Sequence, residues 1–237
     1  MTKLREQSDP DSAEPHGRHC RGDGARPPRG YDAVENFHQP EGGYRFSTDS
    51  ILLAEFVQAV DLERVADFGA GCGVVGLCAL EKNRVMGVRQ FFFVEREPEF
   101  RESLTKNIGL YQPRTEAQLV VLQRDWRDLT PADFGGPLDY VMANPPYFAA
   151  GSGRQSGRPS VNAARREIHG GLGELARTLA GLLAPEGRAA LMLPAARKDE
   201  LLDTLRDSGF QPERMEIIRS GPGGPGRLAL TQARRMI

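Results

Sequence analysis

The sequence predicts an α/β fold with a mostly parallel sheet and helices on both of its faces. Short apolar runs alternate with helical patterns along the chain, which is typical of strand–helix–strand units. The first of these runs ends in a glycine-rich turn, and the last two follow one another across the Gly/Pro turn SGPGGPG. We therefore expect a ligand site at the carboxyl ends of the strands and an antiparallel strand at the C-terminal end of the chain.

Seven apolar runs are strand candidates and five segments are helix candidates. Strands are expected at residues 65–68, 90–95, 119–123, 138–143, 189–193, 215–218 and 227–231. Helices are expected at residues 50–60, 73–82, 98–109, 172–184 and 197–208, because apolar residues recur there at helical spacing. Gly109, Gly187 and Gly209 follow helical patterns and are predicted to end them in the left-handed conformation. This order of elements predicts a Rossmann-like sheet of seven strands.

Composition predicts one domain with a polar tail. The chain has 237 residues, 39% of them hydrophobic, and a formal net charge of -1. Residues 1–30 are rich in Pro, Gly, Ser, Asp and Arg and are expected to be disordered, whereas residues 31–237 are expected to form the domain. No apolar run reaches the roughly 18 residues that span a bilayer, and no signal-peptide core is present, so a cytoplasmic protein without a membrane partner is expected. Cys20, Cys72 and Cys78 lack metal-site spacing, which predicts free thiols and no metal.

The first strand runs into the turn ADFGAGCGVVGL, which predicts a nucleotide-like ligand. Its glycines let the backbone turn sharply, and the following helix offers unpaired N–H groups. Gly71, Gly73 and Gly76 satisfy a dinucleotide-binding spacing, and Glu95 ends the second strand where a ribose hydroxyl is held, so the turn alone permits NAD. Asp67 favours a different ligand, because a carboxylate before the glycines suits a positively charged sulfonium compound better than a pyrophosphate.

The fourth strand ends in LDYVMANPPYF, which predicts a rigid site for a planar amine. Pro145 and Pro146 fix their own dihedrals and hold Asn144 and Pro145 extended at the ligand edge. The Asn144 side-chain oxygen and the Pro145 carbonyl are then two acceptors for the hydrogens of an amine, and Tyr147 can stack on the flat substrate. Two such acceptors favour the pyramidal nitrogen that attacks a methyl sulfonium in line.

Two of these motifs resemble known ones. The pattern formed by Asp67, Gly69, Gly71 and Gly73 resembles the first motif of class I methyltransferases that use S-adenosylmethionine (SAM). That resemblance implies that Glu95, followed by Arg96, binds the ribose hydroxyls and that Asp125, with Trp126 beside the ring, binds the adenine of the cofactor. Asp128 is a competing candidate for the role of Asp125, and a charged surface turn is the simpler interpretation of both.

NPPY resembles the fourth motif of adenine-N6 and guanine-N2 nucleic-acid methyltransferases and of protein glutamine methyltransferases. The segment FHQPEGGYRFSTDSILLAEFV resembles the bacterial tRNA adenine-N6-methyltransferases that act on valine tRNA, and this resemblance covers residues 37–235. It implies that Arg45, Thr48 and Asp49 close over the methionine end of SAM, although Thr48 and Asp49 also suit helix capping. The function expected is methylation of adenine N6 in RNA, most simply tRNA. A protein glutamine, guanine N2 of ribosomal RNA, and a SAM-binding RNA-binding protein without turnover are the alternatives.

The segment after NPPY is basic and predicts contacts with RNA. Arg154, Arg158, Arg165 and Arg166 follow Phe148 without an intervening acidic residue, which suits binding to phosphates, although a solvated loop is the simpler interpretation. Arg234 and Arg235 near the C-terminus are candidates for the same surface, against the interpretation of a charged terminus.

Overall fold

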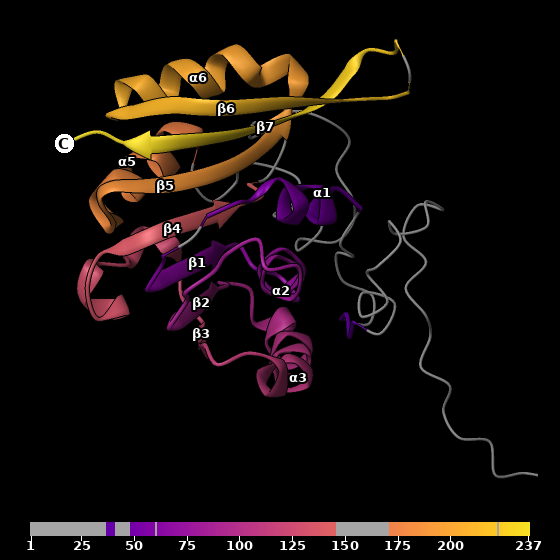
Figure 1. Cartoon of the computed structure of the whole chain (residues 1–237), viewed down its shortest axis with the longest axis vertical. Helices are drawn as coiled ribbons and strands as arrows, with labels where there is room; N and C mark the ends of the chain where they lie inside the picture. Colours follow the sequence, from indigo (N-terminus) through magenta and orange to yellow (C-terminus); the bar gives the residue numbers. More distant parts are fainter. Residues whose placement is uncertain (1–36, 41–47, 60, 146–170, 222) are drawn as a thin grey trace, which may run out of the picture.

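The computed structural model describes residues 37–40, 48–59, 61–145, 171–221 and 223–237. These residues form one seven-stranded sheet with the strand order β3-β2-β1-β4-β5-β7-β6 (Figure 1). The predicted tail, residues 1–30, lies outside the described residues. The strands are β1 (Arg64–Phe68), β2 (Gln90–Val94), β3 (Gln118–Leu122), β4 (Leu138–Ala143), β5 (Leu183–Pro194), β6 (Phe210–Arg219) and β7 (Gly226–Arg235).

The sheet is parallel from β3 to β5, and β7 enters it antiparallel between β5 and β6. The predicted mostly parallel sheet, closed by an antiparallel hairpin, is therefore confirmed. Because a strand that follows its neighbour across a tight turn must reverse direction, the SGPGGPG turn already fixed this end of the sheet.

Helices cover both faces of the sheet. They are α1 (Thr48–Phe56), α2 (Val74–Glu81), α3 (Arg101–Tyr111), α5 (Leu172–Leu182) and α6 (Lys198–Asp207). Figure 1 shows α1, α2 and α3 gathered on one side of the sheet. One hydrophobic cluster joins these three helices to strand residues such as Phe91 and Phe93, and a second joins α5 and α6 to Phe92 and Val94. Successive residues of the FFFV run thus enter opposite cores, as a strand buried on both faces requires.

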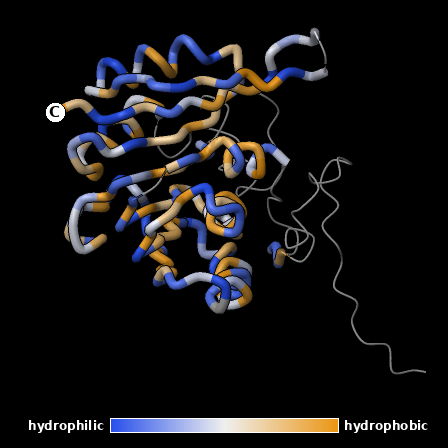
Figure 2. Tube along the Cα trace, viewed as in Figure 1, coloured by the Kyte–Doolittle hydropathy of each residue, from blue (hydrophilic) through white to orange (hydrophobic). Residues whose placement is uncertain are grey.

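Helix α6 is buried along one narrow stripe only, unlike the strand that is buried on both faces. In Figure 2 the α6 tube is largely hydrophilic and is interrupted by hydrophobic positions, and its buried residues are Leu201 and Leu205. A spacing of four residues places both leucines on one face of the helix, so α6 packs on the sheet with a narrow stripe.

Two of the three predicted helix ends are wrong. Gly209 has φ 81 and follows α6 as expected. Gly109 lies inside α3, which continues to Tyr111 and then into a short 3-10 turn, Gln112–Arg114. Gly187 lies inside β5, because α5 passes directly into that strand, and the left-handed residue there is Glu186 with φ 65. Gly187 is needed for a close approach instead, since a Cβ there would lie 2.9 Å from the Ala184 carbonyl oxygen.

Some other element bounds also differ from expectation. The helix expected at residues 50–60 ends at Phe56, and Ala59 instead pairs with Val85 in an isolated bridge. β5 and β6 are more than twice as long as their apolar runs, because polar residues such as Arg188 and Arg214 extend both ladders. Within the described part of the chain, no helix has the length and apolar character needed to cross a bilayer.

Candidate active site

Four strand ends bring most of the predicted site residues to one edge of the sheet. Phe68, Val94, Leu122 and Ala143 end β1 to β4, and the register aligns Phe68 with Val94 and with Ala143, and Val94 with Leu122. The glycine turn, Glu95, Asp125 and Asn144 each follow one of these ends. Since the carboxyl ends of parallel strands form a crevice for ligands, these four features share one site.

The glycine turn has a backbone that only glycine adopts readily. Gly69, Gly71 and Gly73 have φ of 71, 55 and 89 degrees. Gly73 is the residue before α2, and a Cβ there would lie 2.9 Å from the Leu104 side chain of α3. The turn is therefore packed against α3, and its N–H groups lie at the N-terminal end of α2.

Asp67 supports this turn from within the protein. Its side chain is 1% exposed, and its Oδ2 accepts a hydrogen bond of 3.0 Å from the Gly76 N–H in α2. Burial raises the pKa of this carboxyl to about 7, the Gly76 N–H opposes that shift, and nearby Glu95 adds to it. Asp67 thus holds β1 to α2 beneath the glycines, and a positive charge on a bound ligand would favour its ionised form.

Glu95 links the end of β2 to the glycine turn. Its Oε2 accepts from the Gly71 N–H at 2.8 Å and its Oε1 from the Glu97 N–H at 2.7 Å, while burial raises the pKa of the carboxyl. Gln123, at the end of β3, donates to the Glu95 and Arg96 carbonyls at 3.1 and 2.9 Å. Gln123 was missed by the motif analysis, although a polar side chain at the end of an apolar strand was a usable signal.

Asp125 is held by two arginines. Its Oδ2 lies 2.6 Å from the Arg127 guanidinium and 3.4 Å from that of Arg96. Burial opposes ionisation, but the hydrogen bonds from Arg127 and Arg96 outweigh it and lower the pKa of Asp125 to about 2. Trp126 is partly buried and packs against the cluster that contains α5, and Asp128 is exposed. Of the two carboxylates, Asp125 is therefore the fixed one.

Asn144 presents a buried hydrogen-bond acceptor just after the end of β4. Its Oδ1 is buried, and no hydrogen-bond partner for it is found among the described residues. Buried polar atoms without a partner are rare in folded proteins, and one at the end of a strand in a ligand crevice marks a place for a donor from a ligand. Pro145 follows, partly buried. The remaining predicted residues around this motif lie outside the described residues: Arg45, Pro146, Tyr147, Phe148, Arg154, Arg158, Arg165 and Arg166.

Thr48 and Asp49 are the first two residues of α1. Asp49 is 9% exposed, and its Oδ1 accepts a hydrogen bond of 2.6 Å from Arg227 at the start of β7. Arg227 was also missed by the sequence analysis, because nothing in the local pattern connects two residues 178 positions apart. The pair ties the start of α1 to the β6–β7 hairpin.

That Arg234 and Arg235 join the RNA surface stays a prediction, because the basic segment after NPPY lies outside the described residues. β7 runs antiparallel to β5, so its last residues pair with the first part of β5 at the amino edge of the neighbouring strands, away from Asn144. Arg234 is paired with Glu186 and Glu213, and Arg235 donates to the Leu183 carbonyl. Both guanidinium groups are engaged within the fold.

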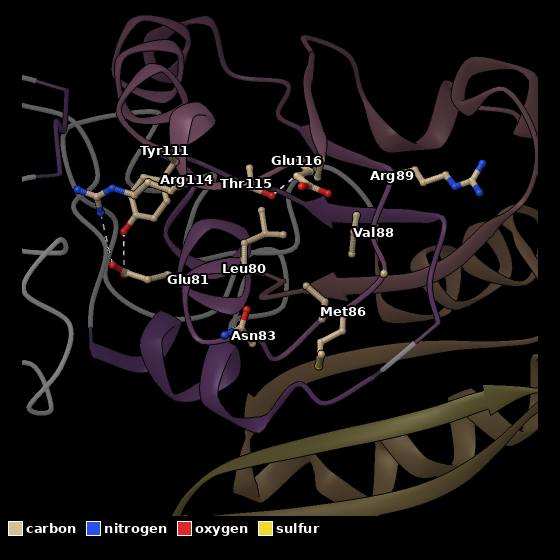
Figure 3. A pocket seen from close by; sticks show the side chains of 13 residues that line it. Leu80, Glu81, Asn83, Met86, Val88, Arg89, Tyr111, Arg114, Thr115 and Glu116 are labelled. Atoms are coloured by element: carbon tan, nitrogen blue, oxygen red, sulfur yellow. Dashed lines mark hydrogen bonds and ion pairs between the residues drawn. The ribbon is translucent and has the colours of Figure 1, made fainter.

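A separate cavity lies at the amino edge of the sheet. It has a volume of about 800 Å³ and lies between the ends of α2 and α3 and the segments that precede β2 and β3. Figure 3 shows Tyr111, Glu81 and Arg114 at one end of this cavity and Arg89 at the other. Because it opens at the opposite end of the strands from the glycine turn, it is not part of the candidate active site.

Residues 48–148 match a family model described as lysine methyltransferase. The "tRNA1(Val) (adenine(37)-N6)-methyltransferase" of Shewanella loihica is 26% identical over 193 residues, which is 79% of this chain and 76% of the relative. An enzyme of the same name from Aeromonas salmonicida is 30% identical over 161 residues, 67% of this chain and 63% of the relative.

A solved structure has the same fold. The magnesium protoporphyrin IX methyltransferase of Synechocystis, solved with bound SAM, superposes with a TM-score of 0.50 at 16% identity over 79% of this chain and 76% of its own. The likeness concerns the fold alone. Three features suit a cofactor with hydroxyl and amino groups beside a reacting centre. They are the glycine turn, the carboxylates of Glu95 and Asp125, and the buried Asn144 acceptor. Together with the family match and the relatives, they identify the chain as a SAM-dependent methyltransferase, with SAM as its methyl donor.

Proposed function

We propose that this methyltransferase modifies the exocyclic N6 amine of an adenine in RNA, with tRNA as the substrate. The observation that carries the proposal is the buried Asn144 Oδ1, which has no hydrogen-bond partner among the described residues. An acceptor of this kind at the end of β4 suits the N–H of an amine. The names of the relatives, which specify a tRNA adenine, support the choice of base and of RNA.

In this proposal Asn144 and Pro145 control the nitrogen. The lone pair of a conjugated amine is delocalised into its ring, so the amine is a poor nucleophile. Hydrogen bonds from both N–H groups to the Asn144 Oδ1 and the Pro145 carbonyl favour the pyramidal form, and Tyr147 stacks on the base. Because these acceptors meet the geometry of the transition state better than that of the planar amine, they act on the rate more than on binding. The methylated nitrogen is acidic enough to lose its proton without a strong base.

The cofactor half of the site lies over β1 to β3. SAM supplies an electrophilic methyl group on a sulfonium. Glu95, with Arg96 beside it, receives the ribose hydroxyls, Asp125 the adenine amino group with Trp126 at the ring, and the Gly69, Gly71 and Gly73 backbone admits the ligand closely. Asp67 contributes negative charge beneath the turn, and Arg45, Thr48 and Asp49 cover the methionine end.

RNA recognition is assigned to the basic segment after NPPY. Arg154, Arg158, Arg165 and Arg166 suit phosphate contacts, and Phe148 suits a base that has left its stack. The target adenine must swing out to reach Asn144, which costs least in a loop. A protein substrate is the competing proposal, favoured by the lysine methyltransferase description of the family match.

The test supplies labelled SAM with bulk tRNA, ribosomal RNA, release factor or total protein in parallel. We expect label in tRNA from the wild type and almost none from Asn144→Ala. Label in ribosomal RNA alone would replace the substrate with guanine N2. Label in protein together with unlabelled tRNA would overturn the proposal in favour of a glutamine or lysine methyltransferase.

A further inference from the structure

One side chain of α3 joins two segments that lie far apart in the sequence. Asn107 is 0% exposed, and its Oδ1 accepts from the His38 N–H at 2.8 Å. Its Nδ2 donates to the His38 carbonyl at 3.0 Å and to the Cys72 carbonyl at 2.8 Å. The amide therefore pairs with the backbone of residue 38 as a neighbouring strand would, and its remaining hydrogen reaches the glycine turn.

A second contact fixes the same N-terminal segment one helical turn further along α3. The Phe37 ring stacks on Tyr111 with 5.8 Å between centroids and 12° between planes, and Phe37 is 5% exposed. Tyr111 is itself held, because its hydroxyl donates to the Glu81 carboxylate at 2.9 Å, and the Arg114 guanidinium lies 5.3 Å from the centroid of its ring (Figure 3). Residues four apart in a helix lie on the same face, so Asn107 and Tyr111 form one contact surface for residues 37 and 38.

The same face of α3 also supports the glycine turn. A Cβ at Gly73 would lie 2.9 Å from the side chain of Leu104, which is three residues before Asn107 in α3. Two other side chains accept hydrogen bonds from backbone N–H groups here. Glu95 accepts from Gly71 in the turn, and Asp67 accepts from Gly76 in the helix that follows. Asn107 adds a donor for a carbonyl, that of Cys72. A turn with three left-handed glycines has many accessible conformations, so bonds of this kind select the one that a ligand meets.

We propose that Asn107 is a positioning residue of the cofactor site, which couples the segment before α1 to the glycine turn. Affinity for SAM then depends on residues 37 and 38, which lie outside the strand–turn–helix unit of the turn itself. This inference rests on the placement of SAM at the glycine turn and not on the identity of the methyl acceptor.

The first variant is Asn107→Asp, which keeps the shape of the side chain and the acceptor for the His38 N–H. It replaces the two N–H donors with an oxygen that faces the His38 and Cys72 carbonyls. We expect the Kd for SAM, measured by calorimetry, to rise about tenfold or more, since a lost charged or buried hydrogen bond has an effect of that order. The KM for SAM should rise in parallel, and kcat at saturating SAM should change by less than about threefold.

The second variant, His38→Pro, removes the backbone N–H that donates to the Asn107 Oδ1, and it changes no residue of α3. The His38 side chain is exposed, so His38→Ala is its matched control and should bind SAM as the wild type does. Ser103→Ala is the control for stability, because Ser103 is also buried on α3 but donates only to the neighbouring Phe100 carbonyl at 3.0 Å. It should lower Tm and leave the Kd for SAM unchanged.

The proposal predicts a raised Kd in both Asn107→Asp and His38→Pro, and wild-type Kd in both controls. If both variants bind SAM as the wild type does, or if Asn107→Asp loses kcat at an unchanged KM, Asn107 has no positioning role and the proposal is overturned. Should Asn107→Asp not fold, the comparison of His38→Pro with His38→Ala decides alone. Absence of tRNA methylation by the wild type would bear on the proposed substrate and leave this test intact.

Discussion

Asp67 and Glu95 are two buried carboxylic acid residues of the candidate active site. Asp67 and Glu95 each accept backbone N–H groups, and burial raises the pKa of both. In the described part of the chain these hydrogen bonds come from backbone N–H groups, in contrast to those of Asp125, whose partners include the Arg96 and Arg127 side chains. A positive charge on a bound ligand would favour the ionised form of both carboxyls.

The pKa of Asp67, raised from 3.8 to about 7, makes stability depend on pH. Between these values the folded protein binds more protons than the unfolded chain, so the free energy of unfolding falls as pH rises from about 4 to about 7. Asp67→Asn should lose this part of the dependence. Thermal melts of both proteins at pH 5 and pH 8 check it, and parallel pH profiles would show that Asp67 is already ionised in the free protein.

Binding of SAM should release a proton near pH 7, because the positive charge of the ligand favours ionised Asp67. Wild-type affinity for SAM should then increase as pH rises through 7, and that of Asp67→Asn should be lower and nearly flat. Calorimetry in two buffers with different ionisation enthalpies measures the proton directly. A binding enthalpy that is independent of the buffer would contradict the assignment.

Asn144 acts on the reaction rather than on the cofactor in this account. Asn144→Ala should lower kcat by about 100-fold or more, the size of the loss when one transition-state hydrogen-bonding group is removed from other enzymes. The Kd for SAM should remain within about twofold of the wild type, because the acceptor meets the substrate nitrogen. Single-turnover rates and calorimetry separate the two effects. Equal losses of rate and cofactor affinity would mean that Asn144 is structural.

At the scale of elements, hydrophobic pattern and turn chemistry predicted much of the fold. Every predicted strand is present, and the hairpin after SGPGGPG is antiparallel. Element ends were less predictable, since Gly109 lies inside α3 and Gly187 inside β5. A glycine after an apolar stripe signals either a left-handed helix end or a close backbone approach, and only the tertiary packing decides between them.

The motifs located the ligand edge, but they did not reveal what holds it together. Glu95, Asp125 and Asn144 could be predicted as site residues because each follows an apolar strand. Asn107, Gln123 and Arg227 were missed because their partners are between 27 and 178 positions away in the chain. Long-range hydrogen bonds leave no periodic signal, so a single sequence could not have assigned them.

Packing of α2 on β2 depends on the absence of a side chain at Gly76. A Cβ there would lie 2.7 Å from both the Phe91 and the Phe93 rings. Gly76→Ala should therefore lower the free energy of unfolding by about 1 to 3 kcal/mol, as overpacking of a core does. Gly109→Ala is the matched helical control, because a Cβ at Gly109 meets nothing within 4 Å. Urea unfolding should show Gly109→Ala equal to or more stable than the wild type. Equal effects of the two variants would contradict this packing.

In the whole molecule, the proposed sites for the cofactor and for RNA lie at different parts of the carboxyl edge of the sheet. The proposed cofactor residues follow β1 to β3, and Asn144 follows β4, so we expect the substrate to approach from the side of β4 and β5. The C-terminal arginines lie at the opposite edge and are engaged within the fold. With a formal net charge of -1, we expect the proposed affinity for RNA to depend on local arginines.

Arg158→Ala should weaken RNA substrate binding in a way that depends on salt. Each lost phosphate contact should reduce the slope of log(kcat/KM) against log salt concentration by about 0.7 to 0.9, while the Kd for SAM stays unchanged. Arg89→Ala is the control, because Arg89 has a side chain 78% exposed beside the cavity at the amino edge. An identical salt slope in Arg158→Ala and Arg89→Ala would remove Arg158 from the RNA surface.

One measurement identifies the atom that receives the methyl group. tRNA that lacks the modification is incubated with the wild-type enzyme and SAM, digested to nucleosides and analysed by mass spectrometry, with Asn144→Ala in parallel. We expect N6-methyladenosine to appear with the wild type and to be nearly absent with the variant. Unmodified tRNA, together with methylated glutamine or lysine in a protein treated in the same way, would contradict it.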